Sequence, residues 1–515
     1  MITQDVNQHP PTITPKPTRE LGRSTLDRHL VSGVAWTGIA RFGSQIVTSS
    51  ALLLQARLLS PADFGIVGMT YILLGFINIV AEFGIGSAIL VMRELSQNQI
   101  RQIHTVSVLL GFSVSVMTLF AAKPMVTFFH KPELLAVVPV MGLGFALSGF
   151  RVVPQSLLAR DLHFKTISSI EAATVVLQAL SSLLTAWLGM RYWSLVIGGL
   201  VGSCLSTALF SIVSPCGFAK PVFRQVREQL AYSQRLLVSR AAWYAYSNAD
   251  FAVAGRILGE SALGLYTMAW NIANAPLDRV VTLILRVTPS VFSSVQHDAA
   301  ELRRYLRVVT EGMALVVFPV GFGVALVTDA AVSALFDKRW AGTTMPLRLL
   351  AICAVLRCIF SVSSQVQTTI RDMRYIMWQS VICLGVLPAS FWYGSRWGAT
   401  GIAAAWLIFY PILQFPALFR TLRKIDMSKR EYLKSMAPAG IASMAMAATV
   451  FSTHYSLHGS RPLIELISEV VVGAAAYLGI LVLLFRSRLD AFLGLVRRSK
   501  GSANPSDLCL VEAAR

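Results

Sequence analysis

The sequence predicts an all-α polytopic membrane protein with about 14 transmembrane helices. Of its 515 residues, 55% are hydrophobic and only 14% are charged, whereas a soluble globular domain carries about a quarter charged residues. Apolar runs of roughly 20 residues, long enough to cross a bilayer, recur along the whole chain. The Lys and Arg residues, in addition, concentrate in alternate loops between these runs.

The apolar runs are expected to be helices, because a backbone inside lipid must satisfy its hydrogen bonds within the segment. In chain order, the predicted spans cover residues 33–57, 66–91, 102–122, 134–156, 169–188, 194–215, 233–255, 262–285, 308–328, 347–368, 375–394, 399–420, 437–454 and 463–485.

The basic residues predict the orientation. With the N-terminus inside, 30 of the 45 Lys and Arg fall in loops or tails assigned to the cytoplasm and ten in outer loops. This bias is the positive-inside pattern, which predicts that both termini are cytoplasmic. We therefore interpret the net charge of +19 as an orientation signal, and expect no nucleic-acid partner.

The N-terminal tail, the cysteines and the loops predict no catalytic or metal site outside the spans. Residues 1–30 are polar and proline-rich, which indicates a disordered cytoplasmic tail and not a signal peptide. The six cysteines show no CxxC spacing, so we predict neither a metal site nor a cofactor. Short loops, with no P-loop, HExxH or GxSxG motif in a suitable context, indicate that the protein is not an enzyme.

An internal repeat predicts two lobes. RLLSPADFGIVGM, residues 57–69, aligns with RILGESALGLYTM, residues 256–268, at a shift of 199 residues. In the first copy, Ser60 is a predicted N-cap, with Pro61 at the first helical position and Asp63 at the third. The same shift places Arg41 of the first span on Arg240 of the seventh.

Six spans separate the copies, which is typical of a parallel repeat about an axis along the membrane normal. We predict two six-helix lobes and two additional C-terminal helices. The predicted parts are a tail at 1–30, an N-lobe at 31–215, a cytoplasmic loop at 216–232, a C-lobe at 233–422, a basic cytoplasmic loop at 423–436, a helix pair at 437–486 and a cytoplasmic tail at 487–515.

Three segments carry a family resemblance, namely LLSPADFGIVGM, the stretch from Asn248 through GRILGESALGLYTMAW, and VTPSVFSSVQHD at residues 287–298. They resemble the polysaccharide (Wzx-like) flippases of the MOP superfamily, and most closely the colanic and teichuronic acid exporters. The likeness extends from about residue 30 to 490, and the order and spacing of the segments carry it.

The resemblance implies a flippase of the bacterial inner membrane with a central cavity and alternating access. It implies that undecaprenyl-pyrophosphate-linked oligosaccharide moves from the inner to the outer leaflet for exopolysaccharide, capsule or O-antigen synthesis. The implied partners are this lipid-linked substrate, membrane lipids, and the polysaccharide polymerase and chain-length machinery.

Arg41 is the most informative candidate residue. Thr37, Arg41, Ser44 and Thr48 form one polar face of the first span, so Arg41 is expected to face the bundle interior. Two hypotheses stay open for Arg41 and Arg240. They bind the pyrophosphate through their planar donor forks, or they neutralise buried acids.

The other candidates are intramembrane polar residues. Arg151, Arg279, Arg357, Tyr244 and Asn248 are assigned to the pyrophosphate and sugar cavity. Interhelical bonding is the alternative for such groups. Glu82, Asp250 and Asp278 are assigned either to a coupling ion or to salt bridges. Two other functions remain, namely a MATE-like drug or small-solute antiporter and a membrane polymerase or ligase.

Overall fold

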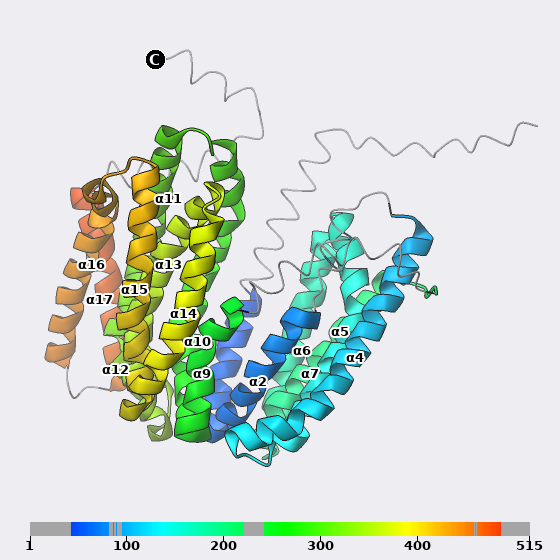
Figure 1. Ribbon diagram of the computed structural model, residues 1–515. Coiled ribbons are helices and arrows are strands. Elements are labelled where there is room, and N and C mark those ends of the chain that lie inside the picture. The colour runs from blue at the N-terminus through cyan, green and yellow to red at the C-terminus, as the bar shows by residue number, and fades with distance from the viewer. Residues whose placement is uncertain are drawn as a thin grey trace, which may run out of the picture.

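The computed structural model describes residues 43–81, 86, 89, 95–220, 242–457, 459 and 461–485. Within these ranges the chain forms helices, turns and short connections and contains no strand (Figure 1). The all-α fold class is confirmed. Arg41, Glu82 and Arg240 lie outside the described residues.

The first half of the chain forms one group of helices. Residues 43–58 are helical, and the following elements are α2 (Pro61–Ala81), α4 (Gln97–Phe129), α5 (Leu134–Arg160), α6 (Phe164–Trp187) and α7 (Trp193–Val213). A capping box starts α4, because Ser96 accepts from the Gln99 amide while the Gln99 side chain accepts from the Ser96 amide.

The second half forms another group. After helical residues 242–247 come α9 (Ala249–Val253), a π-helical turn η1 (Ala254–Leu258), α10 (Gly259–Ser294), α11 (Ala299–Leu326), α12 (Thr328–Leu335), the 3₁₀ turn η2 (Lys338–Thr343), α13 (Thr344–Thr369), α14 (Met373–Gly394), the 3₁₀ turn η3 (Ser395–Trp397) and α15 (Gly398–Lys424). The hairpin α16 (Lys429–Leu457) and α17 (Pro462–Leu484) packs on the outer flank of this group, against α11 and α12 (Figure 1).

Ten segments among the described residues are long and apolar enough to cross a membrane, and one of them, Met373–Lys424, contains both α14 and α15. The predicted number of 14 spans stays a prediction.

Several helices are longer than their predicted apolar runs. For example, α4 begins at Gln97 and ends at Phe129, whereas the predicted run covers 102–122, because polar helical turns extend beyond the apolar window.

The N-cap predicted for α2 is confirmed. The Asp63 carboxylate accepts from both the amide and the hydroxyl of Ser60, at 2.9 and 2.6 Å, and Pro61 is the first helical residue. The other Asp63 oxygen accepts from the amide of Tyr192, at 3.1 Å, in the turn between α6 and α7. The buried carboxylate of Asp63 thus bonds both to the residue that precedes α2 and to the turn between α6 and α7.

The repeat appears as a reciprocal crossing of α2 and α10. Gly65 lies against the backbone of Glu260, and its repeat equivalent Gly264 lies against the backbone of Pro61, which is in turn the equivalent of Glu260. Gly68 contacts its own equivalent, Thr267, so the pseudo-two-fold axis passes between these two residues. The shift of 199 residues read from the sequence therefore relates the two helices that meet at the centre.

The two groups converge at one end of the molecule and diverge towards the other (Figure 1). At the convergent end, Trp340 of η2 is fully buried, donates through Nε1 to the Ala56 carbonyl at 2.8 Å, and stacks edge-on against Phe64. Lys131 also forms a 2.6 Å ion pair with Glu260 across the two groups. This end of the molecule is closed.

Candidate substrate cavity

A cavity of about 850 Å³ lies between the two halves. Its walls come from the first helix, α2, α6 and α7 on one side, and from residues 244–251 and α10 on the other. Most polar lining groups are uncharged. They are Gln45, Thr48, Ser49, Gln55, Tyr71, Gln178, Ser182, Tyr244, Asn248, Thr267, Asn271 and Thr282.

The wall from the first half is fixed by amide and hydroxyl groups. The buried side chain of Gln55 donates from Nε2 to the Ser182 hydroxyl at 3.0 Å, and so ties the first helix to α6. Gly202 of α7 lies directly against the Gln178 side chain. This bond and this contact hold two amide side chains, Gln55 and Gln178, in the wall of the cavity.

Tyr244 connects the opposite wall to α2, and Asn248 bonds to the backbone of Tyr244 within the same segment. The Tyr244 hydroxyl lies 3.1 Å from the Ile72 carbonyl and 3.3 Å from the Tyr71 carbonyl, so it can donate to either, and a Cβ at Gly75 would overlap this phenol. The Asn248 amide donates to the Tyr244 carbonyl at 3.0 Å. Asn248 has non-helical torsions, φ −121° and ψ 8°, at the point where the helix breaks before α9.

The break at Asn248 distinguishes the two repeats. Its equivalent in the first half, Ser49, lies in a continuous helix. In the second half, α9 is followed by the π-helical turn η1 and by Gly259 at φ 82°, a left-handed conformation that glycine adopts without a steric penalty. Such π-turns frequently occur at functional sites.

Two lining residues carry opposite charges, Asp278 and Arg279 of α10. Arg279 donates to the Gln45 side-chain carbonyl at 2.6 Å across the two halves. Within the described lining the formal charges therefore cancel. The guanidinium of Arg279 is exposed and keeps further donors for an anionic ligand.

Arg357 of α13 is not among the residues that line this cavity. Its guanidinium lies over the rings of Trp270 and Trp406, at 4.7 and 5.5 Å from their centroids, and donates to the side-chain oxygen Oδ1 of Asn274 at 3.1 Å. Trp270 does line the cavity. Arg357 is therefore separated from the cavity by the ring of Trp270.

Asp250 is fully buried behind the same wall. One carboxylate oxygen accepts from the Tyr266 hydroxyl and the Trp406 indole, both at 2.7 Å. The other oxygen has no hydrogen-bond partner among the described residues. Trp406 thus lies between the two charged groups. Its indole N–H donates to Asp250, and the guanidinium of Arg357 lies over its ring.

Arg151 lies elsewhere, within the first half. It extends from α5 and donates to the Ser206 hydroxyl of α7 at 3.2 Å. Of the candidates predicted from sequence, the structure thus brings Tyr244, Asn248, Asp278 and Arg279 to the cavity, and places Arg151, Asp250 and Arg357 in the surrounding packing.

Sequence reasoning missed several lining residues. Gln45 and Gln55 lie on the first helix near Thr48, which was predicted to be on its polar face. Gln45 is four residues after Arg41 and Gln55 is two turns after Thr48, so widening and extending that face would have found both. Tyr71 and Trp270 gave no signal, because an aromatic residue in an apolar run is indistinguishable from a core residue until the helix has a known rotation.

A helical bundle in two pseudo-symmetric halves around a polar cavity, closed at one end, is the architecture of a membrane transporter. A family profile described as "Polysaccharide biosynthesis protein" matches residues 54–345, more than half of the chain, and the protein therefore belongs to this family. The resemblance drawn from the sequence motifs is confirmed.

Similar proteins span nearly the same length. The chain is 23% identical to the teichuronic acid biosynthesis protein TuaB of Bacillus subtilis, over 89% of this chain and 96% of that protein. It is 22% identical to the lipopolysaccharide biosynthesis protein WzxC of Escherichia coli, over 80% and 85%. It is 23% identical to the succinoglycan biosynthesis transport protein ExoT of Rhizobium meliloti, over 96% and 99%.

Solved structures show the same fold. The lipid II flippase MurJ in an inward closed conformation superposes with a TM-score of 0.66 at 13% identity, over 88% of this chain and 99% of that one. A multidrug MATE transporter of the MOP superfamily in an inward-facing conformation gives a TM-score of 0.58 at 16% identity, over 74% and 94%.

Proposed function

We propose that the protein is a flippase that moves undecaprenyl-pyrophosphate-linked oligosaccharide from the inner to the outer leaflet of the bacterial inner membrane by alternating access. The uncharged polar cavity between two pseudo-symmetric halves is the observation that carries this proposal. Family membership and the names of the relatives support it.

The cavity chemistry suits sugars. Amide and hydroxyl groups offer both donors and acceptors, which is what a ring of sugar hydroxyls requires. Tyr71 and Trp270 add aromatic rings to the lining, and the volume of about 850 Å³ is within the usual range for pockets that enclose a small ligand. A headgroup of a few sugars fits such a space, so the polyprenyl chain has to remain in the bilayer.

We assign the pyrophosphate to arginines. Arg279 contributes one guanidinium to the cavity. Arg41 and Arg240 each precede a lining residue, Gln45 and Tyr244, by four positions in the sequence. An arginine fork matches phosphate oxygens and stays charged in every state of the cycle.

The acids are assigned to coupling. Asp250 is the strongest candidate for a coupling proton or sodium ion, because it is buried and one of its oxygens lacks a partner among the described residues. Asp278 lines the cavity, and Glu82 remains a third candidate. Arg151 and Arg357 are proposed to position the cavity walls.

The orientation follows from the basic loops. Both termini are cytoplasmic in this proposal, with the lobe limits at 31–215 and 233–422, and the closed end faces outward. The transporter would hand its substrate to a polysaccharide polymerase with its chain-length machinery, and it performs no covalent chemistry. A drug antiporter is less favoured, because the described lining holds a single acid beside a single base.

The test compares Arg41→Ala and Arg240→Ala with Arg461→Ala, a control at an exposed arginine. At matched membrane levels, we expect the first two to abolish surface polysaccharide and to accumulate lipid-linked oligosaccharide in the inner leaflet, and the control to export normally. Arg→Lys should restore export only partly, because an ammonium lacks the bidentate fork.

The competing role predicts a different outcome. If these arginines only neutralise acids, a second change, Glu82→Gln or Asp250→Asn, removes the stranded charge and restores export. Such rescue would reject the pyrophosphate role. Normal surface polysaccharide in a strain that lacks the protein, with drug efflux lost instead, would reject the flippase function itself.

A further inference from the structure

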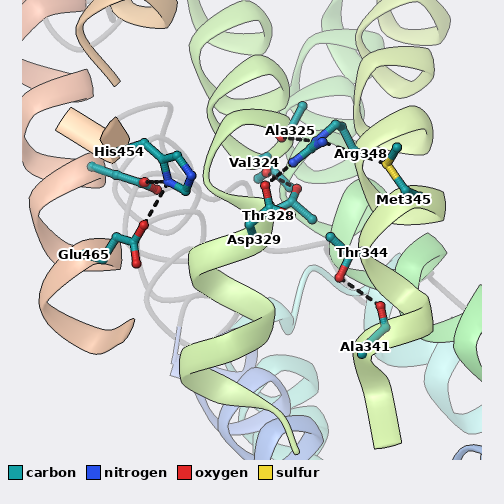
Figure 2. A network of polar contacts seen from close by, with 11 residues as sticks. Val324, Ala325, Thr328, Asp329, Ala341, Thr344, Met345, Arg348, His454 and Glu465 are labelled. Carbon is teal, nitrogen blue, oxygen red and sulfur yellow. Dashed lines mark hydrogen bonds and ion pairs between the residues drawn. The ribbon is translucent and has the colours of Figure 1, made fainter. Parts of the chain in front are cut away.

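The end of the α16–α17 hairpin holds a cluster of three potential metal ligands (Figure 2). Glu465 and Glu469 lie one helical turn apart on α17, and His454 lies in the last turn of α16. The His454 Nδ1 atom is 2.8 Å from an oxygen of Glu465 and 2.8 Å from an oxygen of Glu469. All three ligand atoms lie within 4.8 Å of one another.

Protonation of the histidine alone does not balance the charges in this cluster. Glu469 is 1% exposed and Glu465 is 9% exposed, and both carboxylates approach the same imidazole nitrogen. A protonated histidine supplies one positive charge for two buried carboxylates. An uncompensated buried carboxylate is strongly unfavourable, whereas a divalent cation with a neutral imidazole neutralises both.

A second observation also indicates a ligand. The remaining oxygen of Glu469, Oε2, has no hydrogen-bond partner among the described residues, although the residue is only 1% exposed. The nearby carboxylate of Asp329 supplies no compensating positive charge to Glu469, and the one cation paired with it, Arg348, is bound to Asp329 itself (Figure 2). The unpartnered oxygen is available as a further metal ligand.

The donor set selects the class of ion. One imidazole nitrogen with two carboxylates suits Zn²⁺ or a similar transition metal, whereas Ca²⁺ and Mg²⁺ prefer oxygen ligands alone. Zinc bonds of about 2.0–2.1 Å place tetrahedral ligand atoms about 3.3 Å apart. The 2.8 Å separations therefore need to widen by only about 0.5 Å.

An adjacent cavity gives the ion access. It measures about 650 Å³, and His454, Asp329 and Arg348 are among its lining residues. The ion would enter beside His454 and bind between the two helices. All three ligands belong to the hairpin, so a bound ion would hold α16 against α17, while the packing of α17 on α12 joins the hairpin to the second half.

We propose that His454, Glu465 and Glu469 form a Zn²⁺ site that clamps α16 to α17. This site is separate from the substrate cavity and does not depend on the proposed function. Sequence patterns did not indicate it, because Glu465 and Glu469 follow His454 by 11 and 15 residues across a helix-to-helix turn and match no metal motif.

The experiment measures Zn²⁺ binding to the purified full chain in nanodiscs, prepared with a tag that contains no histidine and stripped with a chelator. We expect about one Zn²⁺ per chain by equilibrium dialysis. A free Zn²⁺ concentration of 100 times Kd should favour the folded state about a hundredfold, which appears as a higher thermal unfolding midpoint.

Glu469→Gln keeps the shape of the side chain, so it should fold, and we expect it to weaken Zn²⁺ binding at least tenfold. His454→Gln should do the same. Glu431→Gln is the matched control, because Glu431 lies at the other end of α16 and pairs with Arg307; its binding should equal that of the unmodified chain.

Three outcomes would overturn the proposal. The first is no stoichiometric Zn²⁺ on the unmodified chain. The second is equal Zn²⁺ affinity in Glu469→Gln. The third is preferential binding of Ca²⁺ over Zn²⁺. If Zn²⁺ has no effect and Glu469→Gln raises the unfolding midpoint by itself, the cluster is held by a proton.

Discussion

Replacing Gly65 by alanine should shift the conformational equilibrium of the transporter away from the state described here. A Cβ at this position would lie 2.5 Å from the carbonyl carbon of Glu260, and one at Gly264 would lie 2.6 Å from that of Pro61. Carbon atoms pack at about 3.5–4.0 Å. The overlap is with backbone, so no side-chain rotation relieves it, and α2 and α10 would have to separate.

The magnitude follows from the cost of overpacking, which is about 1–3 kcal/mol. This cost falls on the state in which α2 and α10 cross closely, and is absent when the two halves part at this end. The population ratio should therefore change about 5- to 150-fold, since about 1.4 kcal/mol is a factor of ten. The gain in helix propensity from glycine to alanine, up to about 1 kcal/mol, stabilises both states and cancels in that ratio.

Labelling of a single cysteine measures the shift. In a background without native cysteines, Thr267→Cys places a thiol between α2 and the cavity. A membrane-impermeant maleimide added to whole cells should label it faster with Gly65→Ala or Gly264→Ala. Gly385→Ala is the control, because a Cβ there meets nothing within 4 Å. Labelling at the control rate in both variants would refute the reasoning, as would a large effect of one equivalent glycine without the other.

Two further changes test the packing around the cavity and the connection between α13 and α14. Tyr266→Phe removes one of two donors to the buried Asp250 carboxylate, so we expect a loss of about 1.5–3 kcal/mol in the free energy of unfolding. The control Tyr455→Phe, at an exposed tyrosine, should change the free energy of unfolding little. Equal thermal midpoints for the two variants would contradict this expectation. Hydrogen bonds from Arg420 hold the pKa of Asp372 below its ordinary value. The stability contributed by Asp372 should therefore be complete above a pH of about 4, the ordinary pKa, and be lost as the pH falls through the lower folded-state pKa. Denaturant unfolding of Asp372→Asn should then converge with the unmodified chain at low pH, and an unchanged gap would contradict the assignment.

Much of the fold could be predicted from the sequence because the bilayer imposes a simple rule. Apolar length located the helices, and the Ser60 cap located the start of α2. The repeat also related the segments that become α2 and α10, and the structure shows that their equivalent residues meet reciprocally, as a two-fold axis requires. These features depend on a local residue pattern or on an internal repeat, and both can be read from the sequence.

The rotation of each helix was harder to predict. Arg357 and Arg279 are both intramembrane arginines, yet one lies behind Trp270 and the other faces the cavity. Hydropathy is averaged around a helix and does not distinguish these positions. The break at Asn248 was missed for a related reason. The residues from Asn248 to Gly259 contain no proline to signal it, and the π-turn packs on α4 and α15, which are distant in the sequence.

The contacts between the two halves are each individually weak, and this suits a transporter. Trp340 bonds a backbone carbonyl, Arg279 bonds an amide, and Tyr244 bonds a carbonyl. Hydrogen bonds of this kind contribute about 0.5–1.5 kcal/mol each, or up to about 3 kcal/mol when one partner is charged, because water can replace the lost partner.

The ion pair Lys131–Glu260 also joins the halves, and its side chains are 28% and 27% exposed. At the membrane surface such a pair contributes about 0–1 kcal/mol. A fully buried ion pair would instead cost about 3–5 kcal/mol when one charge loses its partner. Several weak contacts around a glycine crossing therefore allow the closed end to open and reclose, whereas the buried Asp250, bonded to Tyr266 and Trp406 within one half, can remain intact through the cycle.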